Sequence, residues 1–101
     1  MALLAMITAA LTITVWPEGK AGPSYTHAVR CPGSPLCARL AQVPEPFKPV
    51  PPDTACTQIY GGPQVAFVRG TYNGRRIWAR FNRSDGCQIN RWDRIAFLFR
   101  R

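Results

Sequence analysis

Apolar and polar residues alternate over several stretches of the chain, and this period of two predicts β-strands. The clearest case surrounds Asn73-Gly74, which has apolar runs on both sides. Asn-Gly is the strongest short-range signal for a two-residue hairpin, because both turn positions need positive φ. The strands expected from the pattern and its turn residues cover residues 11–15, 25–31, 64–72, 75–83 and 95–99.

One helix is expected before a proline-rich segment. Ser34 can cap its N-terminus and Pro35 suits its first turn, so residues 36–41 are expected to be helical and to end before Pro44. Residues 43–53 hold five prolines and can form neither a helix nor a central strand. Their PxxP spacings also occur in ligands of proline-reading domains, but a stiff connector across the surface is the favoured interpretation.

Together these elements predict an α+β fold, a two-layer sandwich of an antiparallel sheet of about five strands with one or two short helices on one face. A chain of 101 residues favours a single domain with a modest core. Covalent cross-links contribute much of the stability of domains of this size.

Four cysteines are present, and their spacing matches neither of the zinc patterns built on two CxxC pairs. An even number in a short chain predicts two disulfides and an oxidising compartment. Four free thiols in a cytosolic protein remain the alternative. The cysteines are Cys31, Cys37, Cys56 and Cys87.

The N-terminal residues 1–10 form an uncharged apolar run rich in small residues, typical of the later part of a signal peptide. We therefore expect a remnant of a signal peptide there, a domain over residues 11–101 and a secreted, extracellular protein. The apolar run is too short for a membrane span, so no stable membrane insertion is expected.

The formal net charge of +8 is compatible with a nucleic acid, an anionic surface or an acidic protein as partner. Most arginines alternate with apolar residues, so a solvated sheet face explains many of them. In the strand expected at 75–83 the apolar face holds Ile77, Ala79 and Phe81, and the opposite face holds Arg76, Trp78 and Arg80.

The residues needed for catalysis are not found together. The single histidine, His27, lies in an expected strand with no nucleophile or acid assigned to it, which is typical of a structural or surface histidine. The five acidic residues lie singly in turns and linkers, and no glycine-rich phosphate loop precedes a helix. We expect neither an enzyme nor a bound metal or cofactor.

A different kind of site is indicated by residues 55–63, which follow the stiff connector, contain a cysteine and lead into a hairpin strand. A loop held at both ends has little conformational entropy left to lose on binding, and this favours tight association. A protease can bind such a loop as a substrate and gain little by cutting it, because the new ends stay in place.

Several motifs in this region and elsewhere are similar to those of one family. Cys56-Thr57-Gln58-Ile59-Tyr60 matches its reactive-loop pattern of a cysteine, a small residue or proline, the P1 residue, a β-branched residue and tyrosine. From residue 11 to its end, the chain resembles the Streptomyces-type subtilisin inhibitors. The other matching segments are residues 11–15, 28–31, 37–41, 73–77, 87–90 and the final Phe97 and Phe99.

The resemblance implies that Cys31 pairs with Cys37 and Cys56 with Cys87. It implies a reactive loop with its scissile bond between the P1 and P1′ residues, offered to an extracellular, subtilisin-like serine protease. It further implies support of the loop by Asn90, and homodimers formed through the outer sheet face. The loop residues are Ala55, Cys56 at P3, Thr57 at P2, Gln58 at P1, Ile59 at P1′, Tyr60 at P2′ and Gly61.

Two other functions remain open at this point. A non-inhibitory secreted binding protein would hold an acidic partner or polyanion on the basic sheet face. Alternatively, Gln58 would be the acyl donor for a secreted transglutaminase. A nucleic-acid module is not expected, because export and disulfides argue against it although Trp78 and Phe81 resemble a stacking face.

Overall fold

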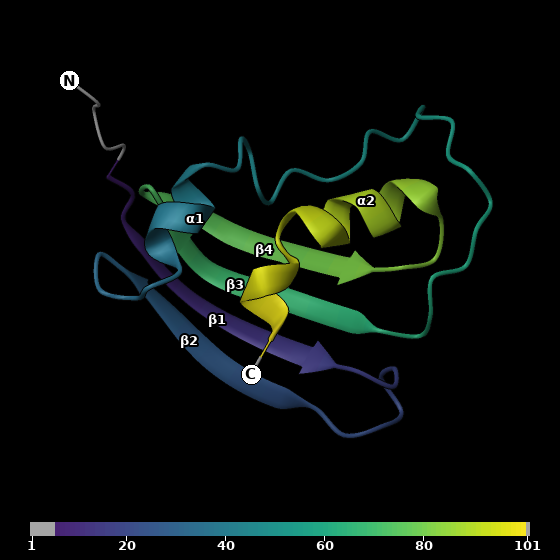
Figure 1. Cartoon of the computed structure of the whole chain (residues 1–101), viewed down its shortest axis with the longest axis horizontal. Helices are drawn as coiled ribbons and strands as arrows, with labels where there is room; N and C mark the ends of the chain where they lie inside the picture. Colours follow the sequence, from purple (N-terminus) through teal and green to yellow (C-terminus); the bar gives the residue numbers. More distant parts are fainter. Residues whose placement is uncertain (1–5, 101) are drawn as a thin grey trace.

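The computed structural model describes residues 6–100. The strand β1 (Ala9–Trp16) lies inside its sheet. It pairs antiparallel with β2 (Tyr25–Cys31) on one side and with β3 (Val65–Tyr72) on the other. The strand β4 (Arg75–Asn82) pairs antiparallel with β3, which gives the order β2-β1-β3-β4 (Figure 1). The predicted antiparallel sheet is confirmed, with four strands instead of about five.

Three helical segments cover one face of this sheet: α1 (Cys37–Ala41), α2 (Gly86–Arg94) and the 3₁₀ helix η1 (Ala96–Phe99) (Figure 1). The α+β class is therefore confirmed. Neither α-helix in the part of the chain that the structure describes is long and apolar enough to cross a membrane.

The strand predicted at residues 95–99 is wrong, because this segment forms η1. In a strand, alternate side chains would leave the core, whereas Phe97, Leu98 and Phe99 are all buried. The N–H of Leu98 donates to the carbonyl of Ile95 at 2.9 Å. The single histidine has a structural contact here, since His27 Nε2 donates to the Leu98 carbonyl at 2.7 Å. Burial of every apolar side chain favours a helical turn at the end of the chain.

Helix α2 occupies residues for which no element was predicted. Asp85 has extended backbone and its carboxylate accepts a hydrogen bond from the N–H of Gln88 at 2.9 Å, so it is the N-cap. Trp92 on this helix is buried, and its ring lies 4.6 Å from that of Phe99. The helix therefore begins beside the end of β4 and packs its apolar side on the core.

The core lies between the sheet and the helical layer. Leu11, Ile13 and Val15 of β1 point into it and are at most 2% exposed. From the helical layer it is filled by Leu40 and Leu98, both fully buried. The predicted faces of β4 are confirmed, since Ala79 and Phe81 are buried while Arg76, Trp78 and Arg80 are exposed.

The predicted hairpin turn at Asn73-Gly74 is confirmed, with φ of +49° and +82°. Asn73 also holds the segment before β1: its N–H donates to the carbonyl of Thr8 at 2.7 Å, and its Oδ1 accepts from the N–H of Thr8 at 2.9 Å. The first strand begins at Ala9, two residues before its predicted start, and Ile7 is buried in the core. The signal-peptide interpretation of residues 1–10 stays a prediction, and residues 1–5 lie outside the described part.

The proline-rich segment, residues 43–53, contains no helix or strand, as predicted. Arg91 of α2, only 9% exposed, holds it in place by donating from Nε to the carbonyl of Lys48 at 2.9 Å and from a terminal nitrogen to that of Arg80 on β4. Its guanidinium lies 3.9 Å from the ring centroid of Phe81, and burial lowers the pKa of Arg91. One buried arginine thus joins the connector, α2 and the edge strand β4.

Candidate functional site

The two disulfide bonds that the resemblance implied, Cys31–Cys37 and Cys56–Cys87, are both formed. The first closes the turn before α1. The second joins the segment after the proline-rich connector to the first turn of α2. Loop-closure entropy predicts a stabilisation of roughly 2 kcal/mol from the first and ~4 kcal/mol from the second.

The predicted reactive segment, residues 55–61, forms an exposed loop without regular structure, which we call the 55–61 loop. Two of its apolar side chains face solvent, with Ile59 55% and Tyr60 70% exposed. Exposed large apolar side chains that lie together are typical of interaction sites. The structure therefore presents the predicted P1′ and P2′ side chains to solvent.

The N-terminal half of the loop is held by α2. Cys56 is bonded to Cys87, and the carbonyl of Thr57 accepts a hydrogen bond from the N–H of Gly86 at 2.8 Å. The first N–H groups of a helix have no partner within the helix, so Thr57 satisfies one that would otherwise stay free. A Cβ on Gly86 would lie 3.1 Å from the Cβ of Thr57, so glycine permits this close approach.

The C-terminal half is held by Arg83, directly after β4. The N–H of Gly61 donates to the carbonyl of Arg83 at 2.7 Å, and Nε of Arg83 donates back to the carbonyl of Gly61 at 3.2 Å. Arg83 is itself oriented by an ion pair with Asp93 of α2 at 2.8 Å. A Cβ on Gly61 would lie 2.8 Å from the side chain of Ile89, so a larger residue here would require Ile89 to shift.

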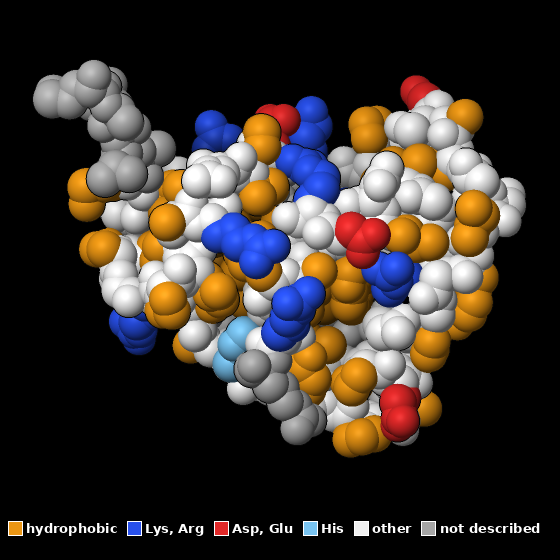
Figure 2. Space-filling view, viewed as in Figure 1, with side chains coloured by type: hydrophobic (Ala, Val, Ile, Leu, Met, Phe, Trp, Pro, Cys, Tyr) orange, Lys and Arg blue, Asp and Glu red, His pale blue; other side chains and the backbone are white. Residues whose placement is uncertain are grey.

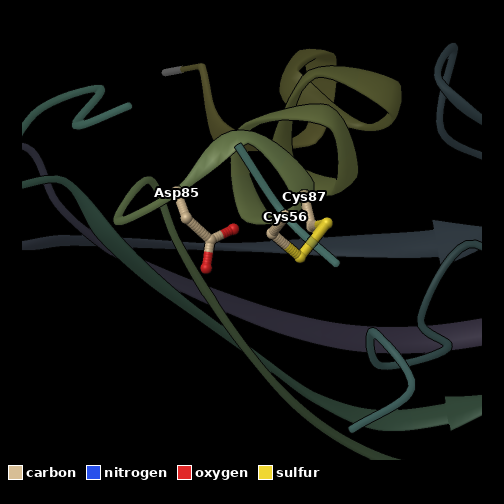
Figure 3. Close-up of side chains that lie close together, drawn as sticks. All are labelled: Cys56, Asp85 and Cys87. Carbon is tan, nitrogen blue, oxygen red and sulfur yellow. A yellow bond between two sulfur atoms is a disulfide. The ribbon is translucent and has the colours of Figure 1, made fainter. Parts of the chain in front are cut away.

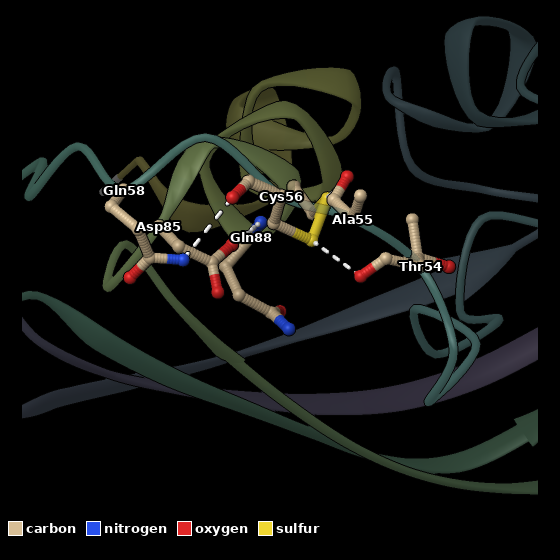
Figure 4. Close-up of a disulfide and its surroundings, with 7 residues drawn as sticks. Thr54, Ala55, Cys56, Gln58, Asp85 and Gln88 are labelled. Atoms are coloured by element: carbon tan, nitrogen blue, oxygen red, sulfur yellow. Dashed lines mark hydrogen bonds between the residues drawn. A yellow bond between two sulfur atoms is a disulfide. The ribbon is translucent and has the colours of Figure 1, made fainter.

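Gln58 lies at the apex, between these two anchors. The N–H of Ile59 donates to the carbonyl of Thr57 at 2.9 Å, which closes a three-residue turn centred on Gln58. The Gln58 side chain folds back and donates from Nε2 to the carbonyl of Cys56 at 3.1 Å (Figure 4). The peptide bond from Gln58 to Ile59 therefore lies on the exposed turn of a loop anchored on both sides.

Three side chains with metal-binding atoms lie beside the loop: those of Cys56, Cys87 and Asp85 have these atoms within 4.8 Å of one another (Figure 3). A metal would need thiolate sulfurs, whereas these two sulfurs are bonded to each other. The carboxylate of Asp85 caps α2. We interpret the cluster as the structural joint between the loop and the helix.

The structure places Asn90 exposed on α2, in a shallow groove whose lining includes Val50 and Thr54. Among residues 6–100 no hydrogen bond joins Asn90 to the 55–61 loop, and its loop-supporting role stays a prediction. Arg83 makes contacts of this kind and was missed by the sequence analysis. Nothing in its sequence position, at the end of an expected strand, pairs it with Gly61.

Comparison with known proteins gives no assignment: no family model, no curated protein and no solved structure matches the chain. The function of the loop must therefore be inferred from its own contacts and chemistry.

Proposed function

We propose that the protein is a serine-protease inhibitor that offers the 55–61 loop to the enzyme as a substrate, with Gln58–Ile59 as the scissile bond. The observation that carries the proposal is the anchoring of the loop on both sides of this bond, through Gly86 on one side and Arg83 on the other. Most of the entropy of ordering the loop is lost on folding, so less is lost on binding.

The same anchors make cleavage unproductive for the protease. After a cut at Gln58–Ile59, the new carboxyl end stays bonded to α2 through Thr57 and Cys56, and the new amino end stays bonded to Arg83 through Gly61. The disulfide also joins the two fragments covalently. The ends remain at a high effective concentration, which favours resynthesis of the bond over release.

Gln58 determines the class of protease in this proposal. Its side chain is long and uncharged, and it lacks the cation that pairs with the pocket aspartate of trypsin-like enzymes. Subtilisin-like enzymes accept varied, fairly large P1 side chains. Entry into the pocket requires release of the hydrogen bond to the Cys56 carbonyl, which costs ~1 kcal/mol before new contacts form.

Two disulfides indicate an oxidising compartment, and we place the inhibitor outside the cell with extracellular serine proteases as its partners. One of them, Cys56–Cys87, also anchors the 55–61 loop.

The proposal is tested by titrating the activity of subtilisin with the oxidised protein. We expect subtilisin to lose its activity at about one inhibitor per enzyme. We expect Gln58→Glu to inhibit at least ~30-fold more weakly, because it puts a charge into a desolvated pocket. Gln42→Glu is the matched control, because Gln42 is exposed and far along the chain from the loop. Full enzyme activity in the presence of excess protein would refute the proposal.

A further inference from the structure

The sheet face opposite the helices, which we call the outer face, carries an unusual set of side chains. It is formed by the outward positions of all four strands, and the register places them in rows across the sheet. Its cations are Arg30 of β2, Arg69 of β3, and Arg76 and Arg80 of β4, all exposed. A solvated face with this much charge needs carboxylates, counterions or a partner to balance it.

No carboxylate balances these arginines within the sheet, because none of the five acidic residues of the chain lies in a strand. The ion pairs among residues 6–100 are Lys48–Glu45 and Arg83–Asp93, neither of them on the outer face. The side of the molecule seen in Figure 2 differs, since it shows both basic and acidic side chains. The charge of the outer face therefore favours an anionic partner.

Trp78 lies between these cations and is 71% exposed. It is directly opposite Arg69 on β3, and Arg76 and Arg80 lie two positions before and after it, about 13 Å apart along the strand. Its ring contacts that of Phe67 edge-on, with centroids 4.7 Å apart and planes at 70°. The indole is thus held in place on the surface, and arginines occupy the neighbouring positions on three sides of it.

A second aromatic group extends this arrangement. Lys20 lies over the ring of Trp16 at 4.5 Å, and both residues line a shallow depression of about 250 Å³ together with Phe67 and Arg80. Aromatic rings and cations therefore continue from the end of β1 to the middle of β4. An open surface of this shape suits a ligand that extends across the sheet.

We infer that the outer face binds an acidic polysaccharide, a chain of pyranose rings that carry carboxylate or sulfate groups. The C–H face of a pyranose packs on an indole, and guanidinium groups pair with carboxylate or sulfate through parallel hydrogen bonds. A second copy of the chain would instead bring Arg69 and Arg80 against like charges. The disulfides indicate a compartment where extracellular polysaccharides occur.

None of the residues of the proposed inhibitory loop, 55–61, lies in a strand of this face, and the loop is anchored by Gly86 and Arg83. The ligand is tested with a fluorescent heparin oligosaccharide, with a neutral dextran oligosaccharide of equal length as control. We expect heparin to bind with an affinity that falls as salt rises, and dextran to bind at least ~100-fold more weakly.

Variants distinguish heparin binding at this site from the non-specific attraction of heparin to a basic protein. We expect Trp78→Ala to weaken heparin binding at least ~5-fold, and Arg69→Gln with Arg80→Gln at least ~10-fold. The control pair Lys48→Gln with Arg100→Gln removes the same charge elsewhere, and we expect it to weaken binding less than ~2-fold. Equal effects of the two charge pairs, or an unchanged affinity of Trp78→Ala, would overturn the inference.

A measurement on the unchanged protein guards against variants that misfold. In heteronuclear NMR, we expect the indole N–H signal of Trp78 to shift on addition of the heparin oligosaccharide, while that of the buried Trp92 stays in place. A shift of the Trp92 signal alone would contradict the assignment. It would also be contradicted if single-stranded oligo(dT) bound more tightly than the heparin oligosaccharide, or if the protein self-associated through this face without binding heparin.

Discussion

Gly61 and Arg83 are joined by two hydrogen bonds of opposite direction, at 2.7 Å and 3.2 Å, one between main-chain atoms and one from the guanidinium. The bonds connect the end of the 55–61 loop to the end of β4, which is part of the sheet. Asp93 orients the guanidinium from α2. The position of the loop is thus determined by both layers of the fold.

Replacing Arg83 tests this contact. We expect Arg83→Gln to weaken inhibition of subtilisin ~10-fold or more and to speed cleavage of the loop, because a charge-assisted hydrogen bond is lost on the primed side. Inhibition constants and cleavage rates measure the effect. Arg100→Gln removes the same charge from an exposed site and is expected to leave both unchanged.

The two disulfides provide an internal comparison. Removal of Cys56–Cys87 by serine at both positions should lower the free energy of unfolding by ~4 kcal/mol and convert the protein into a substrate. Removal of Cys31–Cys37 in the same way should cost roughly 2 kcal/mol and preserve inhibition, since this bond lies outside the loop. Chemical denaturation and the titration of subtilisin measure the two effects. Inhibition that survives the first change would contradict the role of the disulfide as an anchor.

The P1 assignment makes a prediction about specificity. Gln58→Lys should give inhibition of trypsin, because the introduced ammonium pairs with the aspartate of its specificity pocket. Gln42→Lys adds the same charge at an exposed site outside the loop and should not inhibit trypsin. If Gln58→Lys inhibits neither trypsin nor subtilisin although it is folded, Gln58 is not P1.

Arg91 should contribute more to stability than its neighbours on α2. Arg91→Met leaves part-buried carbonyls of the connector and β4 without their donor, and we expect a loss of about 2–4 kcal/mol in the free energy of unfolding. Arg94→Met is the control, since Arg94 donates to the carbonyl of Pro44 at an exposed site and should cost less than about 1 kcal/mol. Urea denaturation of both variants checks the difference.

The phenol of Tyr72 makes stability depend on alkaline pH. Burial raises the pKa of Tyr72 above its usual value of 10.0, and its ring packs edge-on against Phe47 at 5.3 Å. A raised pKa in the folded state means that this stabilisation is complete below pH 10 and is lost as the pH rises through the folded-state value. Tyr72→Phe should therefore lose less stability than the parent between pH 9 and pH 11, while Tyr60→Phe, at an exposed site, should behave like the parent.

Local signals in the sequence predicted the parts of the fold that depend on neighbouring residues. The positive φ values required by Asn73-Gly74 determined the β3–β4 hairpin, and alternation determined which face of β4 is buried. The same reasoning failed at residues 95–99. A short apolar run is compatible with a strand or a buried helical turn, and only packing against the core distinguishes them.

Like the fold, the candidate site was predicted from the sequence only in part. The sequence indicated the segment containing Gln58 as the candidate site, because a cysteine, a stiff connector and a hairpin surround it. Its partners were not found, because Gly86 and Arg83 reach the loop only once α2 has formed and packed beside β4. The helix itself had one local signal, Asp85 as a side chain suited to an N-cap, which was overlooked.

Mass spectrometry of the protein during prolonged incubation with subtilisin tests the central claim most directly. We predict one cut, at Gln58–Ile59, that adds the mass of one water to the disulfide-bonded protein and gives two fragments only after reduction. We further predict that isolated cut protein, returned to the enzyme, regains part of its intact form. Rapid cleavage at several bonds, or a single cut elsewhere with no loss of subtilisin activity, would contradict the account.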